Sequence, residues 1–250
     1  MSVYYAGLVL LGLVVGCVGA YVGIGGGSIV GPTLILLGID PHMAAGTSLA
    51  VVFFTGLSSA IAYARKRLVD WKIGLILELT TFPGGYVGSR LTGITASQTM
   101  KKAYTALLFA LSAYMWLSQG RKLVKEGEGQ SYRVNLWLAL PLSFLAGLSS
   151  GFFGIGGGVI KVPLLTFLGM PVHNAVATST FMIMITSVGG LIGHVHLGNV
   201  NPAYALAIAP GIFLGAQFGS RLAYKSKPEM VAKIFSIVLI TIAFSILLRG

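Results

Sequence analysis

Apolar residues occur along the chain in ten segments that short polar stretches separate. Eight of these segments are long enough to cross the roughly 30 Å apolar core of a bilayer as helices, because each residue advances a helix by about 1.5 Å. Two segments are much shorter, and each follows a cluster of glycines. The ten segments lie at 3–22, 28–38, 43–64, 72–91, 103–118, 135–153, 159–169, 174–193, 203–222 and 231–248.

The stretch GIGGGSIVGP at 23–32 interrupts the apolar pattern with glycine, serine and proline. Glycine costs a helix interior about 1 kcal/mol relative to alanine, so this composition predicts a break in the helix. At membrane depth, irregular backbone is tolerated only where protein buries it or where it lines a water-filled cavity. We therefore expect a structured turn followed by a short half-helix.

The glycine cluster belongs to an internal repeat. Residues 23–49 align without gaps to residues 154–180 at an offset of 131, with 14 of 27 positions identical. The same offset aligns FPGGYVGSRL at 82–91 with FLGAQFGSRL at 213–222, with 6 of 10 positions identical. The chain is therefore predicted to be a duplication, with repeats at 1–120 and 134–250 and a polar cytoplasmic linker at 121–133.

The basic residues favour one relative orientation of the two repeats. If each short segment is re-entrant, every repeat crosses the membrane an odd number of times and the repeats are inverted. The loops at 65–72, 121–133 and 221–233 then hold twelve Lys and Arg residues on one side, against four on the other. Eight plain crossings divide these residues nine against seven. Because cytoplasmic loops are rich in Lys and Arg, we predict inverted repeats with both termini outside.

Composition agrees with a polytopic, all-α membrane protein. Hydrophobic residues make up 55% and charged residues 9% of the chain, whereas soluble domains carry about 25% charged residues. A β-barrel would show short alternating segments instead. The start of the chain has no basic region or clear cleavage site, so it is expected to be a retained helix. We expect a multi-pass protein of the inner cell membrane.

Charge and motif content narrow the function further. The net charge of +11 arises from basic residues in short loops, which indicates membrane topology and not nucleic-acid binding. The single cysteine, Cys17, can form neither an internal disulfide nor a cysteine-based metal site. No motif for ATP hydrolysis, metalloprotease activity or serine hydrolysis is present. The sequence therefore predicts no enzyme activity, cofactor or metal.

The two half-helices suggest a binding site for an anion. The N-terminus of a helix carries unpaired N–H donors and partial positive charge, and two such ends that meet at mid-membrane would hold an anionic group. Alternatively, the glycines serve only to let helices cross closely. The backbone groups expected to contact the anion belong to Gly25, Gly26, Gly27 and Ser28 in the first repeat and Gly156, Gly157 and Gly158 in the second.

Side chains that follow the half-helices are further candidates for the site. Hydroxyl donors occur in both repeats, at Thr47, Ser48, Thr178 and Ser179, although membrane hydroxyls also bond their own helix backbone. His42 and His173 are expected to cap helices at the interface rather than bind a ligand. Lys161 lies inside the second short segment, where it would attract an anion or extend to the interface. Glu78 is the acid well inside an apolar segment, and it either couples transport to protons or pairs with a basic side chain.

The repeated motif resembles a known family. GIGGGSIVGPTLILLGIDPHMAAGTSLAVV and GIGGGVIKVPLLTFLGMPVHNAVATSTFMI, each followed later by GSRL, are similar to the duplicated core of the TauE/SafE family of sulfite and organosulfonate exporters. The resemblance covers nearly the whole chain. It implies a small permease for sulfur-containing anions, with substrate between Gly25–Ser28, Thr47 and Ser48 on one side and Gly156–Gly158, Thr178 and Ser179 on the other.

The sequence thus predicts a secondary transporter of small sulfur-containing anions that works by alternating access between two repeats. A passive anion channel and a non-transporting membrane subunit are the alternatives. The expected partners are the anionic substrate, the lipid bilayer and a coupling ion, either H⁺ or Na⁺. The substrate, the direction of transport and homo-oligomer formation stay open at this level.

Overall fold

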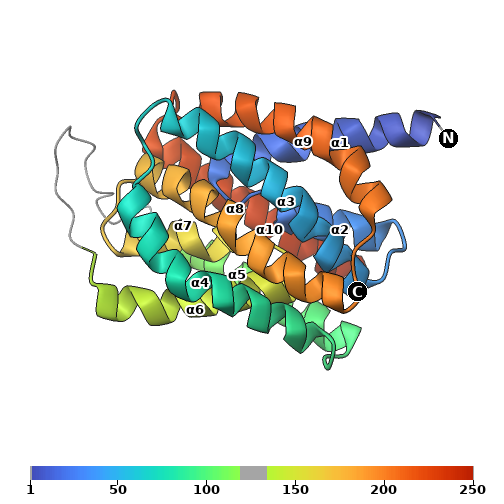
Figure 1. The fold of residues 1–250 in the computed structure, drawn as a ribbon. Helices are drawn as coiled ribbons and strands as arrows, with labels where there is room; N and C mark the ends of the chain where they lie inside the picture. Colours follow the sequence, from blue (N-terminus) through green and yellow to red (C-terminus); the bar gives the residue numbers. More distant parts are fainter. Residues whose placement is uncertain (1, 119–133, 250) are drawn as a thin grey trace.

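The computed structural model describes residues 2–118 and 134–249, and within them the chain forms ten helices and no strand (Figure 1). All ten predicted segments are confirmed as helices. The predicted linker at 121–133 lies outside the described residues. The helices are α1 (Ser2–Val22), α2 (Gly27–Leu36), α3 (Pro41–Ala64), α4 (Trp71–Thr92), α5 (Ser97–Ser118), α6 (Leu136–Phe153), α7 (Gly158–Phe167), α8 (Val172–His196), α9 (Pro202–Ala223) and α10 (Pro228–Arg249).

The helix boundaries repeat with the same offset as the sequence. Helices α2 to α5 begin at residues 27, 41, 71 and 97, and α7 to α10 begin 131 residues later, at 158, 172, 202 and 228. Helices α2 and α7 contain ten residues each and are the two short elements. Four helices, α3, α6, α8 and α9, are long and apolar enough to cross a membrane by length and composition. The fold is therefore that of a polytopic helical membrane protein.

Polar residues at the loop ends start several helices. The Asp40 carboxylate accepts a hydrogen bond from the His42 N–H at 2.9 Å, and Pro41 occupies the first turn of α3. The Asp70 carboxylate accepts from the Ile73 N–H at 2.9 Å at the start of α4. These side chains satisfy backbone donors that a helix leaves without an internal acceptor, so the helix starts are encoded locally.

Glycines allow several helices to pack backbone to backbone, and the contacts show the directions of the helices. Gly211 packs against Val9 and Gly219 against Cys17, where a Cβ atom would collide with a backbone carbonyl. Helices α1 and α9 therefore run parallel. Helices α4 and α6 form the equivalent parallel pair in a second layer of the bundle. This is the use of small residues that close helix packing in membranes requires.

The two equivalent long helices at the centre of the bundle run antiparallel. Gly46 of α3 lies beside His194 of α8, and Gly56 lies beside Met184. Helix α3 also runs parallel to α9, because the Ser58 hydroxyl donates to the Phe213 carbonyl at 2.6 Å and Thr47 contacts the start of α9. Helices α1, α3 and α9 thus share one direction, and α4, α6 and α8 share the opposite one.

These directions define the course of the first short helix. Helices α1 and α3 both start from the same end of the bundle, so α2 must bring the chain back to that end (Figure 1). The turn between α1 and α2 is tight, and the Gly25 N–H donates to the Gly19 carbonyl at 3.2 Å. The break is therefore re-entrant in form. Helix α7 repeats the arrangement between α6 and α8, which start from the opposite end.

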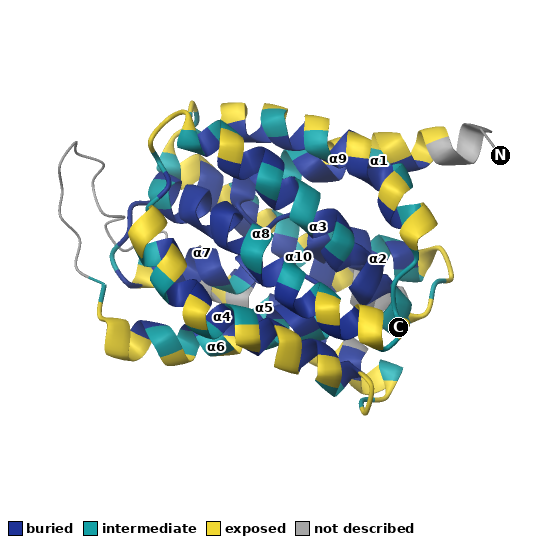
Figure 2. Cartoon of the chain, in the orientation of Figure 1, coloured by how far each residue is buried: buried dark blue, intermediate teal, exposed yellow. Residues whose placement is uncertain are grey.

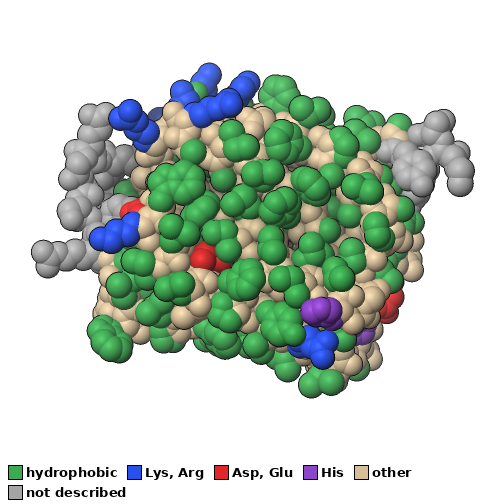
Figure 3. All heavy atoms as spheres, in the orientation of Figure 1, with side chains coloured by type: hydrophobic (Ala, Val, Ile, Leu, Met, Phe, Trp, Pro, Cys, Tyr) green, Lys and Arg blue, Asp and Glu red, His purple; other side chains and the backbone are tan. Residues whose placement is uncertain are grey.

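Burial separates a central layer from an apolar outer face. Helices α3 and α8 are mostly buried, whereas α1, α4, α6 and α9 expose one face (Figure 2). The exposed face carries large apolar side chains such as Leu79, Trp137 and Leu206. The side of the molecule in Figure 3 is covered with hydrophobic side chains. Such a surface is suited to lipid and not to water.

Basic side chains gather at one end of this apolar surface. The turn between α3 and α4 exposes Arg65, Lys66 and Arg67, and the Lys66 ammonium lies 4.6 Å from the ring centre of Tyr224, between α9 and α10. Figure 3 shows Lys and Arg side chains together at the upper left of the molecule. The loops at 65–72 and 221–233, which the count of Lys and Arg residues assigned to the same side of the membrane, therefore lie together.

Candidate functional site

The two glycine turns meet inside the bundle. A Cβ atom on Gly27 would lie 2.8 Å from the carbonyl oxygen of Gly154, and one on Gly158 would lie 2.6 Å from the Cα of Ile24. Both turns are completely buried. Since Gly27 and Gly158 are equivalent in the two repeats, each half-helix begins against the turn of the other. The predicted convergence of the two breaks is present.

Two apolar side chains complete this crossing. Val52 of α3 and Ile183 of α8 are equivalent positions, and both lie within about 3.5 Å of where Gly25 and Gly156 would carry a Cβ atom. The close helix crossing that explains the glycines without a ligand is thus also present. Both turns are buried in this conformation, so a ligand can reach them only if the surrounding side chains or helices move.

The backbone of both turns takes the left-handed conformation that glycine tolerates. Gly25 and Gly26 have φ angles of 76° and 74°, and Gly156 and Gly157 have φ angles of 73° and 78°. Side chains are strained at such angles, which explains the glycines at these four positions. Helix α2 begins directly at this turn, where the Ile29 and Val30 N–H groups donate to the Gly26 carbonyl. The N–H groups of Gly27 and Ser28 precede that first bonded turn.

Ser28 offers a hydroxyl at the start of α2. Its side chain is fully buried, and its Oγ atom has no hydrogen-bond partner among the residues that the structure describes. A buried hydroxyl without a partner costs free energy, so native proteins seldom keep one without a reason. Ser150 of α6 presents a second unpartnered hydroxyl beside the other turn, with its Cβ atom 3.2 Å from where Gly157 would carry one.

The four repeated hydroxyls all make contacts within the protein. Thr47 and Thr178 accept the N–H groups of Asn201 and Asp70, each at 2.9 Å, and so bind the residues that cap α9 and α4. These contacts join the two repeats. Their structural role is clear, and a role in anion binding stays a prediction.

Ser48 and Ser179 contact the glycine turns directly. The Ser48 hydroxyl donates to the Gly27 carbonyl at 3.1 Å, and the Ser179 hydroxyl donates to the Gly23 carbonyl at 3.0 Å. Both side chains are fully buried. They hold the turns in place with the donor hydrogen that an anion would need, and their part in anion binding likewise stays a prediction.

Lys161 and Glu78 form an ion pair inside the bundle. The Lys161 ammonium lies 2.7 Å from the Glu78 carboxylate, and the side chains are 0% and 4% exposed. The Thr186 hydroxyl contacts both, because Lys161 donates to it and it lies 2.7 Å and 2.8 Å from the two carboxylate oxygens. Lys161 therefore does not extend to the membrane interface, which was one of its two predicted roles. Glu78 has the basic partner that was one of its two predicted roles.

The histidines at the starts of α3 and α8, His42 and His173, bond to backbone carbonyls at the C-terminal ends of other helices. His42 bonds to the carbonyl of Thr95 and His173 to that of Ala223, each at 3.0 Å. Both acceptors lie at or just after the C-terminal ends of α4 and α9. Burial alone would raise the pKa of the Asp40 carboxyl, but hydrogen bonds and charge from His42 lower it below its usual range. These contacts fit the predicted capping role.

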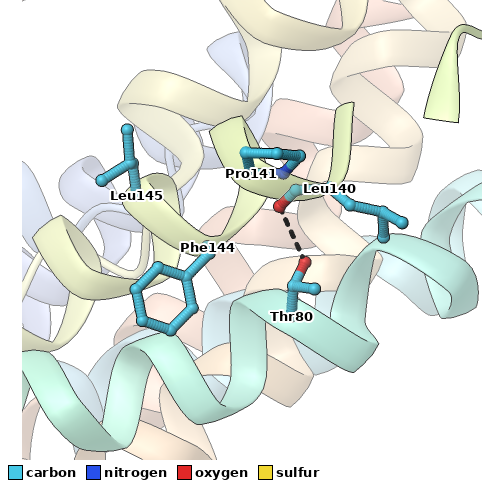
Figure 4. A pocket seen from close by; sticks show the side chains of 5 residues that line it. All are labelled: Thr80, Leu140, Pro141, Phe144 and Leu145. Atoms are coloured by element: carbon cyan, nitrogen blue, oxygen red, sulfur yellow. Dashed lines mark hydrogen bonds between the residues drawn. The ribbon is translucent and has the colours of Figure 1, made fainter. Parts of the chain in front are cut away.

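A groove on the outer surface has a different character. It lies between α4 and α6, has a volume of about 460 Å³ and is lined by Thr80, Leu140, Pro141, Phe144 and Leu145 (Figure 4). The Thr80 hydroxyl donates to the Leu140 carbonyl at 3.1 Å. With an apolar lining and no charged residue, this groove lacks the donors that an anion requires.

Comparison with known proteins decides the family. Residues 8–246 match the family described as Sulfite exporter TauE/SafE. The chain belongs to the TauE/SafE family. The matched region covers nearly the whole of the two repeats and includes both glycine turns and the Lys161–Glu78 pair.

Relatives of this TauE/SafE chain bear the name of probable membrane transporter proteins. It is 33% identical to the probable membrane transporter protein YunE of Bacillus subtilis, over 97% of each chain. It is 30% identical to a probable membrane transporter protein of Methanocaldococcus jannaschii, over 93% of this chain and 91% of the relative. No solved structure matches the chain. The protein is thus a multi-pass membrane transporter and not an enzyme.

Sequence reasoning overlooked four members of the site, which are Val52, Ser150, Ile183 and Thr186. Thr186 and Ser150 lie in apolar segments among many other hydroxyl residues, and their patterns give no sign of their neighbours. Val52 and Ile183 were detectable together, because they occupy equivalent positions in the two repeats. A comparison of equivalent positions for shared apolar residues, as well as for polar ones, would have identified that pair.

Proposed function

We propose that this protein is a secondary transporter of small sulfur-containing anions, of the sulfite and organosulfonate class, with its binding site where the half-helices α2 and α7 begin. The observation that carries the proposal is that two helix N-termini from opposite ends of the bundle meet at one buried point beside the unpartnered Ser28 hydroxyl. Helix N-termini attract anions through free N–H groups and the helix dipole. The family description supports the substrate class.

The repeat provides a means of alternating access. Equivalent helices α3 and α8 run antiparallel, which supports repeats of inverted membrane topology at 1–120 and 134–250. Val52 and Ile183 cover the turns in an arrangement that is nearly the same from both ends. Rocking of one repeat against the other would uncover the turns on one side at a time. The burial of both turns supports an occluded state as one step of the proposed cycle.

The basic end of the bundle supports an orientation. Arg65, Lys66 and Arg67 lie with the α9–α10 turn at one end, and this end faces the cytoplasm of an inner cell membrane in our proposal. Helix α1 starts at the other end, so both termini are outside. The same orientation makes the turns before α3 and after α4 face the exterior.

Thermal stability and uptake in the presence of an anion panel test the function. The purified full-length chain is exposed to sulfite, a monovalent sulfonate, sulfate and phosphate, and uptake of each is measured after reconstitution in vesicles. We expect sulfite or the sulfonate to raise the melting temperature and to accumulate against its gradient. Uptake that only ever equilibrates would indicate a passive channel, and no response to any anion would refute the proposal.

Ser28→Ala and Ser143→Ala form a matched pair of variants for the site. Both side chains are fully buried and both Oγ atoms lack a partner, but Ser143 lies on α6, two helical turns before Ser150. A hydrogen bond to a charged group contributes about 1.5–3 kcal/mol, so Ser28→Ala should weaken anion affinity by roughly 10- to 100-fold. Ser143→Ala should leave it unchanged. Equal effects would exclude Ser28 from the site.

A further inference from the structure

The buried pair of Lys161 and Glu78 breaks the symmetry of the two repeats. At the offset of 131, the positions equivalent to Lys161, Glu78 and Thr186 hold Val30, Ala209 and Thr55. Val30, Ala209 and Thr55 are buried as well. The equivalent positions are therefore buried and apolar in one repeat, whereas they hold a buried ion pair in the other. The fold does not require charges at this place, which points to a functional reason for them.

The pair lies against the second glycine turn. Lys161 is in the first turn of α7, where its N–H donates to the Gly157 carbonyl at 2.9 Å. Its side chain bends back, so that Cε lies 3.4 Å from where Gly157 would carry a Cβ atom. The unpartnered Ser150 hydroxyl is next to the same position. An anion at the start of α7 would therefore approach the side chain of Lys161.

Few other titratable groups face Glu78 from the helices packed around it. Lys161 is the single titratable residue of α7, and α6 contains none. In α8, His194 bonds to the Gly151 carbonyl and His173 to the Ala223 carbonyl, while His196 lies at the helix end. Within the described part of the chain, Lys161 is thus the charged residue that contacts Glu78.

We propose that Glu78 is the exchangeable counter-anion of Lys161 and that transport is electroneutral symport of one proton with one monovalent anion. This inference rests on the proposed function. The substrate anion replaces the Glu78 carboxylate as the partner of the Lys161 ammonium, and Glu78 takes up one proton from the side to which the site is open. On release to the other side, the anion and the proton leave together and the ion pair forms again.

Charge balance is the physical reason for the fixed ratio. Before exchange, the cluster holds one ammonium and one carboxylate; after exchange, it holds one ammonium, one bound monoanion and a neutral carboxyl. Net charge in the buried site is zero in both states, whereas an unpaired charge there would be very costly. Thr186 can adapt, because its hydroxyl lies 2.7 Å from Glu78 and 3.1 Å from the Met182 carbonyl, and can donate to either.

Sulfonate uptake into vesicles tests the coupling, because a sulfonate stays monovalent across the working pH range and only the protein changes its protonation. The wild-type chain should concentrate methanesulfonate on the alkaline side by roughly tenfold per pH unit, with one proton taken up per anion. An imposed membrane voltage should not alter the accumulation. Net charge movement, or uptake that ignores the pH gradient, would overturn the proposal without any variant being needed.

Glu78→Gln provides the second arm, since glutamine mimics the protonated carboxyl. This variant should still exchange internal for external sulfonate, which shows that it is folded, but its pH-driven accumulation should fall from about tenfold to none. Accumulation equal to the wild type would refute the coupling role of Glu78 and leave the anion site in place. If the wild type takes up no anion of the panel, the proposed function fails and the coupling fails with it.

Discussion

Removal of one partner from the Lys161–Glu78 pair should destabilise the protein far more than removal of both. Lys161→Met leaves the Glu78 carboxylate buried with Thr186 as its neighbour, and Glu78→Leu leaves the ammonium in the same position. Breaking a buried ion pair on one side costs about 3–5 kcal/mol, because a buried charge loses its compensation. Each single variant should be destabilised by about that amount.

The double variant Lys161→Met/Glu78→Leu should recover most of this loss. Apolar residues of similar volume often replace a buried pair at no cost, or with a gain of about 1–4 kcal/mol. Thr186 still has the Met182 carbonyl at 3.1 Å as an acceptor, so the replacement leaves no new orphan donor. The equivalent positions in the other repeat, Val30 and Ala209, are themselves buried apolar residues.

Reversible unfolding in mixed micelles, followed by loss of helical circular dichroism, measures the four proteins under one condition. The double variant should be at least about 3 kcal/mol more stable than either single variant. Leu79→Met, a volume-conserving change at the exposed neighbour of Glu78, serves as a control and should cost less than about 1.5 kcal/mol. Single-variant effects that add within about 0.5 kcal/mol would refute the pairing.

Three further changes test the packing and the topology. Gly158→Ala should prevent folding or strongly destabilise the protein, because its methyl group would collide with the opposite turn, whereas Gly31→Ala, with 3.8 Å to its nearest neighbour, should keep or raise the melting temperature. Thr47→Val removes the acceptor for the capping residue of α9 and should cost about 1–3 kcal/mol in the same unfolding assay, unlike Thr47→Ser. In a chain without Cys17, a cysteine at Lys66 should react with an impermeant maleimide from the cytoplasm and one at Ile94 from outside; the reverse pattern would invert the orientation.

Much of the architecture follows from the sequence because its signals are local or repeat at a constant distance. The apolar segments and the glycine clusters predicted the ten helices, and the offset of 131 predicted the duplication that the helix starts repeat. The glycine clusters predicted the two breaks, since left-handed backbone at Gly25, Gly26, Gly156 and Gly157 excludes most other residues. Each of these features depends on neighbouring residues and needs no knowledge of distant ones.

The partners of the polar side chains depended on the tertiary structure. Lys161 and Glu78 are 83 residues apart, and nothing between them in the sequence indicates that α4 and α7 bring them together. Hydroxyl residues that look alike in the sequence have different surroundings in the structure. The Ser48 hydroxyl donates to the Gly27 carbonyl, whereas the Ser28 hydroxyl has no hydrogen-bond partner among the described residues. Hydropathy indicates whether a residue is buried from water. A hydrogen bond or ion pair between distant residues depends instead on which helices pack side by side. The packing of the helices is set by backbone contacts between segments that are far apart in the sequence.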